Sequence, residues 1–81
     1  MEEPKYIEYN YAIEKLAALE HEQWAHWTKY MLRTLGYHEG SGNIFVRMWF
    51  REIETSYEAL SEKQKESDRK WARKAYNLLF K

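Results

Sequence analysis

The sequence contains no cysteine, one proline and three glycines among its 81 residues. Without cysteine the chain forms neither a disulfide nor a thiolate metal site, and it has no thiol nucleophile. Its uncharged apolar runs, such as residues 44–46 and 48–50, are far shorter than the ~18 residues that a membrane span requires. The first five residues are acidic and polar, unlike a secretion signal. We therefore expect one small cytoplasmic domain spanning residues 1–81.

A surplus of charge of one sign is also absent, because 13 basic residues balance 13 acidic ones. This argues against a sequence-blind binder of nucleic-acid polymers, whose affinity comes from excess Lys and Arg. The charge is nevertheless uneven: residues 1–40 sum to −3 and residues 41–81 to +3. A local face that attracts anions is therefore expected in the second half.

Aromatic residues are abundant, with four Trp, seven Tyr and three Phe. Most are expected in the core, because a small domain needs large side chains to bury enough area. Some of them are candidates for stacking on a ligand.

Apolar residues at three- and four-residue steps predict a first helix over about residues 10–35, with residues 4–9 as an extension. Gly36 is the expected stop, and either Asn10 or Pro4 marks the start. The predicted apolar face consists of Ile13, Leu16, Ala17, Trp24, Trp27, Met31 and Leu35.

Two shorter helices are expected to follow. The first of them is capped by Ser41, Gly42 or Asn43, and the next runs from Glu62 to about Leu79. Residues 61–64 (SEKQ) form a capping box at the start of that third helix. The apolar faces of these two helices are predicted to contain Phe45 or Val46, Trp49, Ile53 and Tyr57, then Trp71, Ala75, Leu78 and Leu79.

The predicted fold is all-α, a small bundle of about three helices with a long first helix. A helix of 26 residues is about 39 Å long at ~1.5 Å per residue. A compact domain of this size is about 30 Å across, so the first helix would overhang it. We therefore expect the bundle to be completed by homo-oligomerisation.

The apolar face of the first helix is interrupted at Glu20 and His21. Burying these groups costs several kcal/mol unless they find partners. The neighbours on the same face are Ala17, Trp24, Ala25 and Thr28. Small residues beside an indole and a polar floor predict a small-ligand pocket. The alternative is a structural hydrogen bond from His21 to another helix, with the alanines permitting close packing.

Basic residues gather on the later helices, where residues 63–74 sum to +4. One interpretation is a solvated face with ion pairs four residues apart, such as Glu66–Lys70. The other is phosphate recognition by arginine forks, beside aromatic rings that stack on a base. The second interpretation makes the candidate ligand-binding residues His21, Trp24, Thr28, Arg47, Tyr57, Arg69 and Arg73.

No metal, cofactor or catalytic centre is predicted. His21 and His26 are five residues apart and point to different faces of a helix, whereas zinc ligands on one helix lie three or four apart. The serines lie in a loop, at helix ends or on a charged face, and Glu20 and His21 diverge by ~100°. We therefore expect a protein that is not an enzyme.

Two segments resemble the ryanodine-receptor-type (RyR) domain. Residues 16–24 (LAALEHEQW) resemble its opening motif, and residues 57–69 (YEALSEKQKESDR) resemble its closing segment, with Ser56 where proline is usual. Gly36 and Gly40 resemble its turn. Residues 41–55 depart from the family, which usually has a loop there, and are closer to a compact bacterial or phage variant. The motif positions carried over are His21, Trp24, Tyr57, Leu60, Asp68 and Arg69.

The resemblance implies a small helical module that is not an enzyme, and in several relatives an association with nucleotide signalling or antiviral defence. Combined with the residues, it predicts binding and sequestration of a nucleotide-derived signal, such as a cyclic nucleotide or an NAD-derived messenger. A free-standing module of this kind suits a phage sponge against host defence, acting in the host cytoplasm. The alternatives are a protein–protein adaptor that uses an aromatic helix face and, third, a small hydrolase of the messenger.

Overall fold

The computed structural model describes residues 3–80, and the side chains of residues 9–80. Helix α1 spans Glu3–Thr34, α2 spans Ile44–Ile53, a 3-10 turn η1 covers Tyr57–Ala59, and α3 spans Glu62–Phe80. These residues contain no strand, so the predicted all-α class with three helices and a long first helix is confirmed. The extension over residues 4–9 is also helical. Asn10 therefore lies inside α1, and its expected role as a cap was wrong.

The ends of the helices lie where local chemistry puts them. Gly36 has φ +92°, and its N–H donates to the Arg33 carbonyl at 3.0 Å while the Tyr37 N–H donates to the Leu32 carbonyl at 2.9 Å. These two bonds are the Schellman closure of α1, which favours glycine at the left-handed position. The Asn43 side chain accepts from the first free amides of α2.

The predicted capping box is present at the start of α3. The Ser61 hydroxyl accepts from the Gln64 N–H, and the Gln64 side-chain oxygen accepts from the Ser61 N–H, both at 3.2 Å. Two backbone donors are thereby satisfied reciprocally at this helix end.

The core consists of two separate clusters on α1. Toward its N-terminal half, α3 and η1 cover Ile13 and Ala17, with Tyr57, Leu60 and Ala72. Ala17 and Ala72 are both fully buried, and small side chains let two crossing helices approach closely. Toward its C-terminal half, α2 covers Leu32 with Val46 and Phe50.

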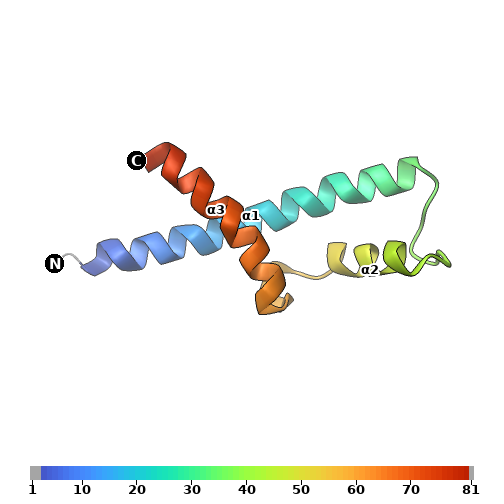
Figure 1. The fold of residues 1–81 in the computed structure, drawn as a ribbon, viewed down its shortest axis with the longest axis horizontal. Helices are drawn as coiled ribbons and strands as arrows, with labels where there is room; N and C mark the ends of the chain where they lie inside the picture. The colour runs from blue at the N-terminus through green and yellow to red at the C-terminus, as the bar shows by residue number, and fades with distance from the viewer. Residues whose placement is uncertain (1–2, 81) are drawn as a thin grey trace.

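The helices form an open arrangement rather than a closed bundle (Figure 1). Helix α1 runs the length of the molecule, α2 folds back along its second half, and α3 crosses it near the middle. The molecule measures 55 × 22 × 14 Å, and its radius of gyration is 15.5 Å. A compact chain of this length has a radius of about 12 Å. The expected overhang of the first helix is therefore present.

The buried face of the second half of α1 differs from the prediction. Leu32 is buried, whereas Trp27, Met31 and Leu35 are 65%, 48% and 66% exposed. Helix α2 packs on a different side of α1 from the one that α3 covers, so the apolar stripe stays covered only in its first half. The same shift occurs in α2, where Val46 and Phe50 are buried but Phe45 and Trp49 are exposed.

In α3 the predicted apolar face was also displaced. Ala72 is buried, but Trp71, Leu78 and Leu79 are exposed. The C-terminal part of this helix extends beyond the crossing point with α1 (Figure 1), and Leu78 and Leu79 there are 84% and 73% exposed. No helix among the described residues is long and apolar enough to cross a membrane.

Candidate functional site

His21 links α1 to the loop after α2 and to α3. It lies on α1 and is only 5% exposed. Its Nε2 donates to the Thr55 carbonyl at 2.7 Å, so Nε2 carries the proton. Its Nδ1 lies 3.9 Å from the Asp68 carboxylate on α3. The predicted structural hydrogen bond is thus present, although its acceptor is in the loop after α2 rather than in a helix.

The break in the apolar stripe is therefore filled by the protein's own groups at His21. Among the described side chains, no buried polar atom lacks a hydrogen-bond partner. The expected hydrogen bond from His21 to a ligand cannot come from Nε2, because the Thr55 carbonyl already accepts that proton. A histidine in this position holds the loop and α3 against α1.

Glu14 organises a second polar network, on α1 seven residues before His21. It accepts from the Tyr57 hydroxyl at 2.8 Å and from Arg69 Nε at 2.7 Å. Arg69 also donates to Glu62 at 3.0 Å. The hydrogen bond from Arg69 lowers the pKa of Glu14, and burial together with the Glu14 hydrogen bond raises the pKa of Tyr57 to about 12.

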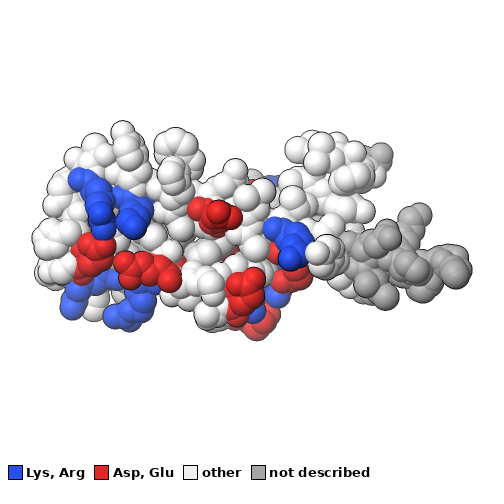
Figure 2. Space-filling view, turned by 180° about the vertical axis from the view of Figure 1, so that it is seen from behind, with Lys and Arg blue, Asp and Glu red and all other residues white. Residues whose placement is uncertain are grey.

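The arginines expected to hold phosphate are engaged elsewhere. Arg69 is bound by Glu14 and Glu62, and Arg73 is bound by Glu66. Arg47 is exposed on α2 and lines none of the clefts described below. Figure 2 shows acidic and basic side chains next to one another on one face, rather than a separate positive patch. The structure therefore does not form the predicted anion clamp.

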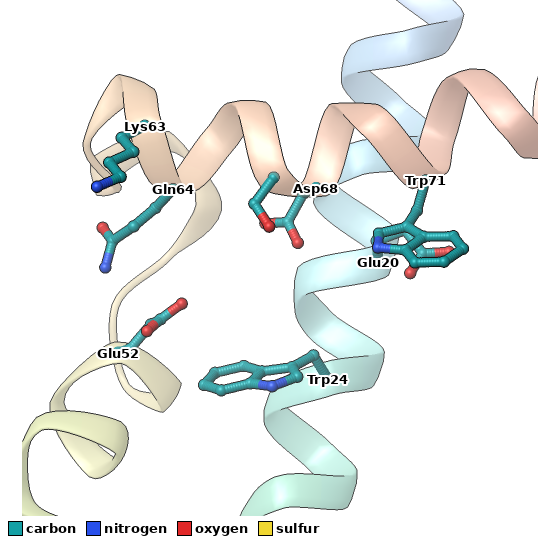
Figure 3. Close-up of a pocket in the computed structure, with 8 residues that line it drawn as sticks. Glu20, Trp24, Glu52, Lys63, Gln64, Asp68 and Trp71 are labelled. Atoms are coloured by element: carbon teal, nitrogen blue, oxygen red, sulfur yellow. The ribbon is translucent and has the colours of Figure 1, made fainter. Parts of the chain in front are cut away.

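One cleft, which we call the main cleft because two indoles line it, is bounded by α1, α3 and the end of α2 and has a volume of about 430 Å³. Its lining residues are Glu20, Trp24, Glu52, Lys63, Gln64, Ser67, Asp68 and Trp71. In Figure 3 the Trp24 indole extends from α1 toward Glu52, while Asp68 and Gln64 project from α3. Two indoles and three carboxylates thus share one open cleft, and Lys63 is the single cation among the described residues that line it.

Asp68 reports the electrostatics of this cleft. Its pKa is raised, first because burial disfavours the charged carboxylate and also because Glu52 and Glu20 add negative charge nearby. The neighbouring His21 acts in the opposite direction. The negative potential would be relieved by a cation in the cleft and reinforced by an anion.

A second cleft of about 440 Å³ lies on another side of His21. Both His21 and Tyr57 line it, together with the carboxylates of Glu22, Glu54 and Glu58. Its described lining includes no Lys or Arg. This cleft is therefore acidic too, and it has no indole.

The predicted site residues are consequently divided. His21 and Trp24 are in contact, with ring centroids 5.8 Å apart and planes inclined by 22°, yet Trp24 opens into the first cleft and Tyr57 into the second. Four further predicted residues line neither cleft: Thr28, Arg47, Arg69 and Arg73. The predicted residues are therefore not brought together in one site.

The sequence analysis did not identify Glu52 and Trp71 as site residues. Trp71 was expected in the core of α3, and the helical spacing gave no reason to bring Glu52 beside Trp24. Asp68 was noted only through the RyR resemblance. No group of three or more potential metal ligands occurs among the described residues.

Comparison with protein families, with curated proteins and with solved structures finds no match to this chain. The resemblance to the RyR domain therefore rests on its motifs alone and stays a prediction.

The Glu14 network makes a prediction about pH. Because the pKa of Glu14 is lowered in the folded protein, its charged form contributes stability that is present at pH 7 and is lost as the pH falls below 4.5. Glu14→Gln should lower the free energy of unfolding by about 1–2 kcal/mol at pH 7, since the half-exposed site discounts a charged hydrogen bond. Urea unfolding at several pH values measures this.

The difference in unfolding free energy between Glu14→Gln and the natural protein should shrink as the pH approaches about 3, near the lower end of the range of glutamate pKa values in proteins. Glu22→Gln, at an exposed position on the same helix, is the control and should change little at any pH. If Glu14→Gln lowers the free energy of unfolding equally at pH 7 and at about pH 3, where most glutamates are protonated, the effect is not ionic in origin.

Proposed function

We propose that this chain is a binding module, not an enzyme, and that its main cleft binds an organic cation, an ammonium or guanidinium group. The observation that carries the proposal is the lining of the cleft, where Trp24 and Trp71 stand among three carboxylates. Indole faces attract cations through their quadrupole, and carboxylates supply the charge and the hydrogen-bond acceptors. The volume of about 430 Å³ is in the range of small-ligand sites.

The cleft already has one indole that associates with a cation. The Lys74 ammonium lies 4.6 Å from the centroid of the Trp71 ring. Trp71 is half-exposed, so its ring remains accessible beside Lys74. This contact supports the chemistry proposed for the cleft, because it places an ammonium group against the same indole.

Nucleotide binding, with sequestration of a signal, is the second candidate. Its support is Trp24, which offers a stacking surface, and Gln64 and Lys63, which offer donors to a base or phosphate. The carboxylates of the same cleft oppose it, because they repel a phosphate. We therefore rank a cationic ligand before a nucleotide.

Calorimetric titration tests both candidates with one panel: spermidine, choline and arginine methyl ester as cations, adenosine monophosphate and a cyclic dinucleotide as anions. We expect heat from at least one cation, with a Kd on the order of 100 μM, and none from the anions. Trp24→Ala should weaken that binding by about 10-fold or more, because it removes a cation–π surface worth ~1–2 kcal/mol when desolvated.

Trp27→Ala is the matched control, since Trp27 lies three residues along the same helix and does not line the cleft.

Binding of the cation should also weaken as the pH is lowered through the raised pKa of Asp68, because protonation removes one of the three negative charges. Heat from the nucleotides alone would favour the second candidate. The absence of binding heat with every compound of the panel would overturn both candidate functions.

A further inference from the structure

A broad apolar surface lies uncovered on α1 and α2. We call it the outer face and define it by Trp27, Met31 and Leu35 of α1 and Phe45 and Trp49 of α2. Four of them are 48–66% exposed and Trp49 is 44% exposed. Large apolar patches of this kind are rare on monomeric proteins and mark interaction surfaces.

Helix geometry places the two halves of the outer face on the same side of the molecule. Trp24 of α1 and Glu52 of α2 line one cleft, which fixes a common side for both helices. Trp27 and Met31 follow Trp24 by three and seven residues, so they lie on the same side of α1. On α2, Trp49 and Phe45 precede Glu52 by three and seven residues, so they lie on the same side of α2 as Glu52. Both halves of the outer face therefore adjoin the cleft.

The outer face also continues a surface that is already covered elsewhere. Along the first half of α1, Ile13 and Ala17 belong to the apolar stripe and are buried by α3 and η1. Met31 and Leu35 prolong that stripe at helical spacing, but α3 has crossed α1 and left it by that point. Apart from the interruption at Glu20 and His21, the stripe is thus apolar over its length, and it is covered over half of it.

The surface area of the whole chain is large enough to include a standard interface. The chain exposes 6353 Å². A compact monomer of 10.0 kDa exposes about 5,200 Å². The excess of about 1,100 Å² exceeds the ~800 Å² that each partner contributes to a standard stable interface.

We propose that the outer face binds the outer face of a second copy of this chain, in a two-fold symmetric dimer. In such an interface the same surface serves both partners, and aromatic and methionine side chains at its centre are typical. The defining residues carry no charge, and the net charge of the chain is zero, so two copies do not repel each other. The second copy would cover the apolar stripe on the later half of α1, as α3 covers it on the earlier half.

Sedimentation equilibrium and light scattering of the full chain between about 5 and 200 μM test the proposal. We expect a mass near twice 10.0 kDa at the upper concentration. Trp27→Glu on α1 and Trp49→Glu on α2 should each weaken association at least about 10-fold, because each places a charge in the apolar centre. Circular dichroism should show an unchanged helix content, since both indoles are exposed in the single chain.

Tyr11→Glu is the matched control. Tyr11 is 63% exposed on the same helix, close to the 65% of Trp27, but lies about 160° around the helix axis from it. It should leave the dimer intact. A monomeric natural chain at the highest concentration would overturn the proposal, and so would a dimer that survives Trp27→Glu and Trp49→Glu or that dissociates with Tyr11→Glu.

This inference is independent of the cation proposal. Trp27 and Trp49 do not line the main cleft, so their variants should still give the calorimetric signal of the natural protein. Loss of dimerisation with retained cation binding, or the reverse, tells the two apart.

Discussion

Leu32→Ala should release α2 from α1 and lower the free energy of unfolding by about 3–5 kcal/mol. Leu32 is 2% exposed and meets Val46 and Phe50, and these three residues are the buried core of the α1–α2 contact. Truncation removes a large share of that core and leaves a cavity. A domain of this length has a total stability of only ~4–12 kcal/mol, so the loss is a large fraction of it.

Thermal unfolding followed by circular dichroism measures this effect, and amide exchange locates it. We expect the amides of α2 to exchange first, because α3 retains its own cluster on the other half of α1. Leu78→Ala is the control, since Leu78 is 84% exposed on α3 and should cost little. Similar losses for the two leucines, or unchanged protection of α2, would show that this cluster does not hold the helix.

His21→Ala should be nearly as damaging, at about 2–4 kcal/mol. The substitution leaves the Thr55 carbonyl without its donor and removes a ring that is 5% exposed between α1, the loop and α3. It also removes the ring whose Nδ1 lies 3.9 Å from the Asp68 carboxylate and which stacks on Trp24. The melting temperature should fall by at least about 8 °C, because 1 kcal/mol corresponds to ~4–8 °C in a domain of this size.

Thr55→Ala tests whether any substitution in this loop destabilises the protein, or only one that removes the hydrogen bond from His21 to the Thr55 carbonyl. It keeps the backbone carbonyl that His21 uses and removes only the hydroxyl that donates to the Arg51 carbonyl at 2.7 Å. We expect it to cost below about 1 kcal/mol, the value of one exposed hydrogen bond. If Thr55→Ala were as harmful as His21→Ala, the imidazole would not be the group that secures the loop.

The end of α1 and the starts of α2 and α3 could be predicted because their causes are local. Gly36, Asn43 and Ser61 act within a few residues of themselves, so their chemistry is legible in the sequence. The choice between Leu32 and its neighbours Met31 and Leu35 could not be predicted in this way. Helical spacing defines an apolar stripe only to within about one residue on either side, and the partner helix selects which edge is buried.

The same distinction explains the site. The interruption at His21 was visible because a polar residue in an apolar stripe is a local signal. The fate of Arg69 was not, since Glu14 lies 55 residues away and is brought to it only by the crossing of α1 and α3. Spacing along a single helix did not identify the ion pair either, because Glu66, expected to pair with Lys70, binds Arg69 and Arg73 instead. The cleft of Trp24, Glu52 and Trp71 likewise depends on three helices meeting.

The crossing of α1 and α3 also decides how the molecule presents itself when it is attached to something else. The first and last described residues lie toward the same end, and the hairpin of α1 and α2 lies at the other (Figure 1). A tag, a fused protein or a solid support joined at either terminus would therefore leave the hairpin pointing outward. Immobilised preparations coupled through the two opposite termini should behave alike toward anything that approaches that hairpin.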